Sequence, residues 1–178
     1  MLHRASSGIA ALLLAGAALL CAHAQVVDFD SERLPVVEIH NLWRFHTGDD
    51  PRWADPNFDD SGWPLLRPDE SWSDQGYKGY GGMAWYRFKL LVPLKHQQLA
   101  IYFPALVTSF QVFVNGRLIG QEGGLPPHES VIEGGSPLYV IPGDTVNNSS
   151  ISIAIRVWDW PYWAAVFGGG FLGGTPYR

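Results

Sequence analysis

The chain has 178 residues and a formal net charge of −5. A mildly acidic chain without clusters of basic residues argues against nucleic acid or an anionic membrane surface as the main partner. The single cysteine, Cys21, lies in an apolar N-terminal run, so no disulfide is expected in the remainder of the chain.

Residues 1–24 have the features of a secretory signal peptide. A weakly basic start precedes an apolar run from Ile9 to Leu20, and Ala22-His23-Ala24 has the small-x-small form of a signal-peptidase site. The apolar run is too short to span a membrane. We therefore expect cleavage after Ala24 and export to the periplasm or the cell exterior; the alternative is an uncleaved anchor.

A polar leader over residues 25–41 precedes the domain, which we assign to residues 42–178, a length that suits one core. A stretch rich in turn residues, from Trp43 to Arg87, contains five of the eight tryptophans. Because so many aromatic side chains in solvent would be costly, this stretch is predicted to be a long ordered loop bounded by strands.

The centre of this loop carries a dense group of turn residues beside two large rings. Phe58 and Trp63 are expected to close one end of the domain. The side chains of Asp59, Asp60 and Ser61 are expected to bond the amides of turns or caps.

Later segments alternate apolar and polar residues, as half-buried strands do. These segments are residues 85–92, 99–103, 109–115 and 150–158. In the first of them the pattern places Arg87 opposite the apolar face. Asn115-Gly116 predicts a two-residue hairpin turn before a returning strand, Arg117 to Gly120, and residues 138–141 form a further strand. Short strands separated by turns predict an all-β sandwich.

Several short motifs follow one another between Leu42 and Val157. They are Trp43-Arg44-Phe45, Gly48-Asp49, Trp53, Phe58-Asp59-Asp60-Ser61 with Trp63, Trp85-Tyr86-Arg87, Val112 to Gly120, and Ile153 to Val157. Together they resemble the N-terminal sugar-binding-type domain of glycoside hydrolase family 2 and the galactose-binding-like domains of bacterial surface sensors. The resemblance implies a jelly-roll β-sandwich and says less about function, because one fold serves many functions.

The resemblance also implies a larger context. Such a domain precedes a catalytic barrel in the hydrolases, and membrane spans with a signalling phosphatase or kinase in the sensors; this chain contains neither. Those domains usually end on a further strand, whereas here the glycine-rich residues 168–174 take its place. We expect either an abbreviated last strand or the front end of a longer protein.

Three pairs of adjacent carboxylates are candidates for acid–base catalysis of the kind that glycosidases use. They are Asp49/Asp50, Asp59/Asp60 and Asp69/Glu70. Adjacent side chains point apart, and Asp is common in turns and caps, so a structural role is favoured. The resemblance places the family's catalytic carboxylates in its barrel, and this chain is not expected to be an enzyme by itself.

Metal and nucleophile motifs are absent from the sequence. The histidines lack metal-site spacing, and neither a calcium-loop motif nor a GxSxG motif is present. No cofactor is expected, although a structural calcium held by separate loops stays an open alternative, since such a site leaves no short motif.

Two aromatic clusters are the candidate ligand sites, because sugars bind to ring faces with the help of nearby polar groups. One lies in the tryptophan-rich loop. The other follows the last strand, where Pro161 is expected to end the ladder and leave the rings in an end loop. The predicted ligand-binding residues are Trp72, Tyr77, Tyr80, Arg156, Trp160 and Trp163. The alternative for each ring is packing in the core or against another domain.

The sequence thus predicts an exported, non-catalytic carbohydrate-recognition domain of a surface receptor or multidomain enzyme. Its expected partner is a carbohydrate or a neighbouring domain. The alternative is a structural accessory module with no ligand of its own, and an intact glycoside hydrolase ranks last.

Overall fold

The computed structural model describes residues 39, 41–92, 98–104, 108–130, 135–146 and 150–171. The predicted signal peptide, its cleavage site and nearly all of the leader lie outside the described residues. The chain divides into two units, Met1–Val37 and Glu38–Arg178, and every element described below belongs to the second.

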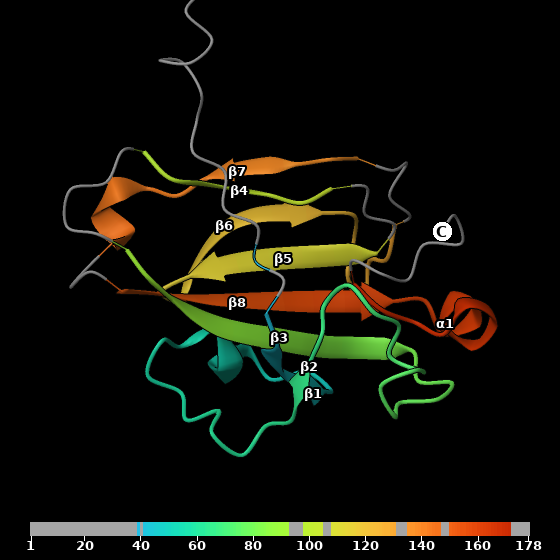
Figure 1. Cartoon of the computed structure of the whole chain (residues 1–178). Coiled ribbons are helices and arrows are strands. Elements are labelled where there is room, and N and C mark those ends of the chain that lie inside the picture. Colours follow the sequence, from blue (N-terminus) through green and yellow to red (C-terminus); the bar gives the residue numbers. More distant parts are fainter. Residues whose placement is uncertain are drawn as a thin grey trace, which may run out of the picture. The chain divides into compact units, whose positions relative to one another are not determined.

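Within the described ranges the chain forms eight strands, two short 3₁₀ helices and one α-helix (Figure 1). In chain order these are β1 (Trp43–Thr47), η1 (Pro51–Ala54), β2 (Leu65–Leu66), β3 (Gly82–Leu91), β4 (Ala100–Tyr102), β5 (Ser109–Val114), β6 (Arg117–Glu122), β7 (Leu138–Val140), η2 (Gly143–Thr145), β8 (Ser150–Asp159) and α1 (Pro161–Phe167).

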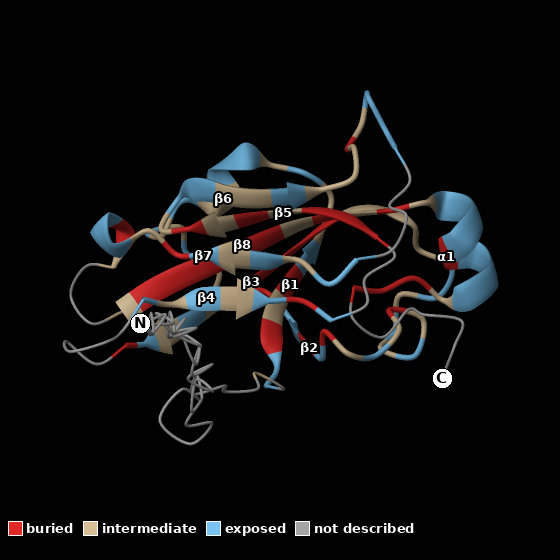
Figure 2. Ribbon diagram, turned by 90° about the horizontal axis from the view of Figure 1, so that it is seen from above, coloured by how far each residue is buried: buried red, intermediate tan, exposed pale blue. Residues whose placement is uncertain are grey.

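The strands make two antiparallel sheets. The larger has the order β2-β1-β3-β8-β5-β6, and the smaller consists of β4 and β7. Buried side chains from β1, β3, β5 and β8 pack with Phe103 and Ile141, which follow the strands of the smaller sheet. Figure 2 shows the buried residues concentrated along β3, β5 and β8. The predicted all-β sandwich is confirmed.

The predicted strand patterns hold most closely in β8 and in the β5–β6 hairpin. Ile151, Ile153 and Ile155 are each at most 1% exposed, as the alternation requires. Asn115 and Gly116 both have positive φ, 47° and 83°, which is the geometry of a tight hairpin turn matched to strand twist. β5 returns as β6 through this turn.

The tryptophan-rich loop lies elsewhere than predicted. Trp63 packs with Trp85 and Ala154 on the face of β3 and β8 opposite the main core, with Phe58 partly buried beside them. We call this face the outer face of the larger sheet. The prediction that Phe58 and Trp63 close an end of the domain is therefore wrong: the loop covers a sheet face, so the central strands bury side chains on both sides.

Arg87 is the second departure from the pattern. Its side chain is 1% exposed, and its Nε donates to Asp60 Oδ2 over 2.7 Å. Its Nη1 donates to the carbonyl of Trp53, and its guanidinium lies 5.6 Å from the ring centre of Phe58. Asp60 is thus the counter-ion of a buried cation rather than a turn cap, whereas Asp59 does accept from an amide, that of Ser61, at 3.0 Å.

The third departure is at the end of β8, where a short helix replaces the predicted end loop. Pro161 occupies the first turn of α1, a position where its missing N–H costs nothing. Gly168, with φ of 92°, ends the helix in the left-handed conformation. The chain then returns Phe171 to the core with 0% exposure. In the part of the chain described here, no helix is long and apolar enough to cross a membrane.

Candidate functional site

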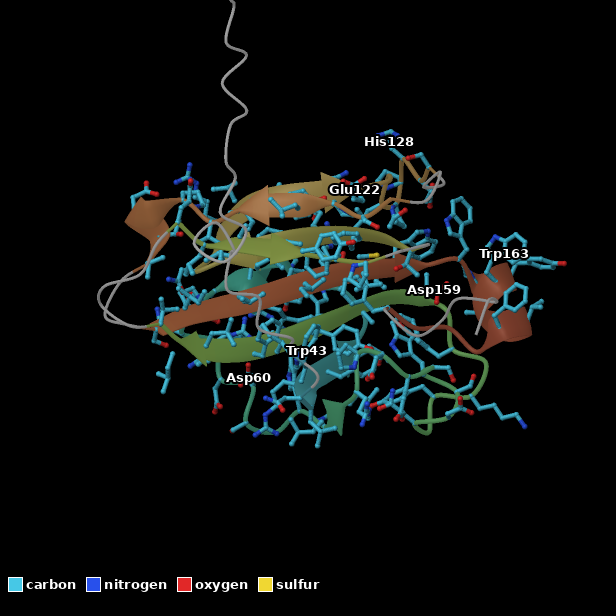
Figure 3. All side chains as sticks on the ribbon, turned by 45° about the horizontal axis from the view of Figure 1, so that its top comes forward. Trp43, Asp60, Glu122, His128, Asp159 and Trp163 are labelled. Carbon is cyan, nitrogen blue, oxygen red and sulfur yellow. The ribbon has the colours of Figure 1, made fainter. Side chains whose placement is uncertain are left out.

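The helix α1 carries several exposed apolar side chains. Tyr162, Trp163, Val166 and Phe167 are 71%, 51%, 56% and 39% exposed, and we call these four residues the aromatic end. The Trp163 ring lies 5.3 Å from that of Tyr162 and stacks on that of Phe167 at 5.5 Å and 16°. Figure 3 shows Trp163 on α1, with Asp159 at the adjoining end of β8. Clustered exposed rings of this kind mark an interaction surface.

Close backbone packing holds α1 in place. Ala164 is fully buried, and a Cβ on Gly81 would lie only 2.6 Å from Pro161 Cα and 2.8 Å from Ala164 Cβ. Glycine at position 81 therefore lets the loop before β3 approach the first turn of the helix. A helix of this length would not form alone, so its exposed rings depend on this packing for their placement.

A groove lies beside the helix, between α1 and the loop that follows β2. Its volume is about 540 Å³ and its walls are Ser73, Asp74, Lys78, Gly79, Ala165, Val166 and Gly168. Asp74 is oriented by a 2.7 Å hydrogen bond from Ser71 Oγ, and Lys78 is exposed. The groove thus offers charged groups on one wall and aliphatic groups on the other.

The first predicted aromatic cluster is fully buried at Trp72 and partly buried at Tyr77 and Tyr80. Trp72 is 0% exposed and its Nε1 donates to the Tyr86 hydroxyl over 2.7 Å, so its ring has no face left for a sugar. Tyr77 packs 4.9 Å from the Phe45 ring, and the Tyr80 hydroxyl donates to the carbonyl of Met83. Trp72 therefore packs in the core, which was the alternative to its predicted role in ligand binding.

The second predicted cluster is divided between two places. Trp160 precedes α1, is partly buried and lies 6.2 Å from the ring of Trp158, while Trp163 is on the aromatic end. Arg156 is on the outer face of the larger sheet, where its nitrogens contact Asp49 and Gln111 rather than either ring. The sequence analysis did not identify the partners of Arg156. Gln111 could have been found, because it alternates with the apolar residues of its strand and so is expected to point away from the core.

A buried carboxylate fastens the segment that follows α1. Asp159 is 6% exposed, and its Oδ2 accepts from the Gly170 amide at 2.8 Å. Two backbone hydrogen bonds hold the same segment: the Trp72 amide donates to the Gly169 carbonyl at 3.0 Å, and the Ser73 amide donates to the Gly168 carbonyl at 2.9 Å. Burial raises the pKa of Asp159 to about 6, although the hydrogen bond from Gly170 acts in the opposite direction.

This burial predicts a pH dependence of stability that Asp159→Asn removes. Because the folded-state pKa lies above the unfolded value, the folded protein binds the proton more tightly, and stability falls as pH rises from about 4 through about 6. We expect Asp159→Asn to raise the free energy of unfolding at pH 7.5, by about 3 kcal/mol at most, with little change at pH 4. Urea unfolding at both pH values measures this, with the exposed Asp144→Asn as control; equal effects at both pH values would contradict the assignment.

The adjacent carboxylates all have structural partners. Asp50 pairs with Arg52, Asp60 with Arg87, and Asp69 and Glu70 with Arg67. Among the described residues, no three side chains of His, Cys, Asp or Glu gather as a metal site would require.

The comparisons with known proteins agree with this fold. No family model matches the chain. A Formosa agariphila protein assigned as a beta-glucuronidase is 30% identical in an alignment 128 residues long, and the match covers 64% of this chain and 12% of that protein. The Bacteroides uniformis beta-glucuronidase 2 structure, covalently bound to cyclophellitol-6-carboxylate aziridine, is 25% identical, with a TM-score of 0.54 over 67% of this chain and 14% of that one.

A beta-glycosidase structure from Bacteroides vulgatus, 22% identical with a TM-score of 0.56, covers 68% of this chain and 17% of its own, and supports the fold alone. The chain spans about one eighth to one sixth of the length of these proteins. The matched part and the strand order together show that this chain has a β-sandwich similar to a part of these beta-glucuronidases.

Proposed function

We propose that this domain is an exported, non-catalytic carbohydrate-recognition module of a glycoside hydrolase-related protein. The observation that carries the proposal is the aromatic end, with exposed rings next to a groove that has charged groups on one wall. Two of the relatives reported above are named as beta-glucuronidases, so glucuronide-bearing glycans are the first ligands to consider.

The aromatic end has the physical properties that sugar recognition needs. The Trp163 ring is half exposed, and its contact with Phe167 restricts its orientation, so little side-chain entropy is lost on binding. Asp74 and Lys78 in the groove can accept from and donate to hydroxyl groups.

A second candidate is docking against a neighbouring domain of the same protein. Val166 and Ala165 are exposed beside the rings, and such aliphatic groups add buried area in a protein interface without recognising hydroxyls. In this alternative the aromatic end is covered in the whole protein and binds no glycan.

A glycan array probed with the secreted chain distinguishes the two candidates. We expect binding, and we expect Trp163→Ala to weaken it about tenfold or more while changing the free energy of unfolding by no more than about 0.5 kcal/mol. Tyr102→Ala is the matched control, because Tyr102 is a similarly exposed ring, 55%, on β4. A wild-type chain that binds no glycan would overturn the carbohydrate proposal and leave docking.

Export has its own test. When the full chain is expressed with its signal peptide in a bacterial host, we expect the exported fraction to begin at Gln25, because Ala22 to Ala24 suits signal peptidase. Intact-mass measurement of that fraction checks this. Protein that keeps Met1 in the exported fraction would contradict the cleavage site.

A further inference from the structure

A continuous row of polar side chains crosses the outer face of the larger sheet. Arg156 on β8 donates to both carboxylate oxygens of Asp49, at 2.7 and 2.5 Å, and to Gln111 Oε1 on β5 at 3.0 Å. Gln111 Nε2 donates to Gln121 Oε1 on β6 at 2.8 Å, and Gln121 Nε2 donates to the carbonyl of Gly123 at 2.9 Å. We call Asp49, Arg156, Gln111 and Gln121 the polar strip.

The strand register sets the order of the polar strip. Gln111 is the direct cross-strand partner of Arg156, and Gln121 is the direct partner of Gln111. Trp85 Nε1, from the cluster beneath, donates to Asp49 Oδ1 at 3.0 Å. Partial burial acts to raise the pKa of Asp49, but the hydrogen bonds from Arg156 and Trp85 outweigh it, so the pKa lies below its usual value and the ion pair persists at neutral pH.

The polar strip is ordered and still open to solvent. The side chains of Arg156 and Asp49 are 21% and 30% exposed, and Gln121 is exposed. Each amide uses one of its two N–H groups in the contacts above, and the guanidinium uses three of five. The strip therefore presents further donors and acceptors in fixed positions, which neighbouring hydroxyl groups of a sugar can engage with little ordering cost.

Two partly exposed tryptophans, Trp158 and Trp160, lie in the chain between Arg156 of the polar strip and α1. Trp158 lies two residues after Arg156 on the same face of β8 and is partly exposed, and its ring is 6.2 Å from that of Trp160, which immediately precedes α1. In Figure 1 the strand β8 runs directly into α1. At about 3.3 Å per residue, the distance from Arg156 to Trp160 is on the order of 13 Å, longer than one sugar ring.

We infer that the polar strip is a second saccharide subsite and that the ligand of this domain is an oligosaccharide extending along β8 from the aromatic end. The inference rests on the proposed function, because it assumes that the aromatic end binds sugar. The charges of Asp49 and Arg156 cancel, and the two glutamines are neutral, so the unit on the strip is a neutral sugar bound through adjacent hydroxyls with its apolar face towards Trp158.

Calorimetric titration of the secreted chain with the strongest trisaccharide from the glycan array, and with its constituent monosaccharides, tests this. We expect the affinity of the wild type for the trisaccharide to be at least about tenfold higher than its affinity for any of the constituent monosaccharides. The double variant Gln111→Ala/Gln121→Ala should keep its monosaccharide affinity and lose most of that advantage. The control is Gln98→Ala, which removes an exposed glutamine outside the polar strip.

The outcomes separate the two proposals. If the double variant keeps the full trisaccharide advantage, the polar strip is structural and the inference is overturned, while the proposed function stands. If no sugar binds the wild type, both fall. If the double variant is destabilised, Gln111→Glu is tested in its place. This substitution keeps the acceptor for Arg156 and removes the donor to Gln121. An unchanged trisaccharide affinity would again overturn the inference.

Discussion

Asp60→Ala is expected to lower the free energy of unfolding by about 3–5 kcal/mol, far more than the loss of a turn cap. The reason is Arg87, whose side chain is 1% exposed and whose Nε lies 2.7 Å from Asp60 Oδ2. Removing the carboxylate leaves a charged guanidinium buried between the tryptophan-rich loop and β3. Urea denaturation followed by tryptophan fluorescence measures the change.

The adjacent residue supplies the control. Asp59 is exposed to solvent at the same turn and accepts from the Ser61 amide, so Asp59→Ala should cost about 1 kcal/mol. Replacing both charges, as in Asp60→Leu/Arg87→Met, should recover much of the stability, because a buried ion pair often breaks even with apolar residues of similar size. Equal losses for Asp59→Ala and Asp60→Ala would show that Arg87 does not depend on its counter-ion.

Trp72→Ala is expected to cost about 3–5 kcal/mol, as removal of a fully buried large ring does. The ring is 0% exposed, contacts Phe45 at 5.5 Å, and donates from Nε1 to the Tyr86 hydroxyl. Its backbone amide also holds the segment after α1 through Gly169. The free energy of unfolding of Trp72→Phe should lie between those of the wild type and Trp72→Ala, because phenylalanine keeps much of the ring volume and loses the hydrogen bond.

Trp163→Ala is the matched comparison, since it removes the same side chain from an exposed position. Its effect on the free energy of unfolding should stay within about 0.5 kcal/mol. The contrast separates a packing tryptophan from one available to a ligand. A Trp72→Ala protein as stable as the wild type would return that ring to the candidate surface.

Local sequence was sufficient to predict features that depend on a single strand or turn. Alternation along residues 150–158 identified β8 and its buried face, because side chains of a strand change faces at every residue. Asn115-Gly116 identified its hairpin, because few residues tolerate positive φ at both central positions. Short strands separated by turns predicted the all-β sandwich, the family resemblance pointed to the same architecture, and the comparisons agree with it.

Tertiary structure decided the roles of individual side chains. Trp72 and Trp163 are the same residue type in turn-rich or strand-end sequence, and only packing across the fold leaves one at 0% exposure and the other at 51%. Strand alternation placed Arg87 opposite the apolar face. It did not predict that Arg87 is buried there, because alternation carries no information about a loop that folds over the second face of the sheet. The polar strip joins side chains up to 107 positions apart in the chain, and cross-strand register, which depends on all the paired strands at once, brings them together.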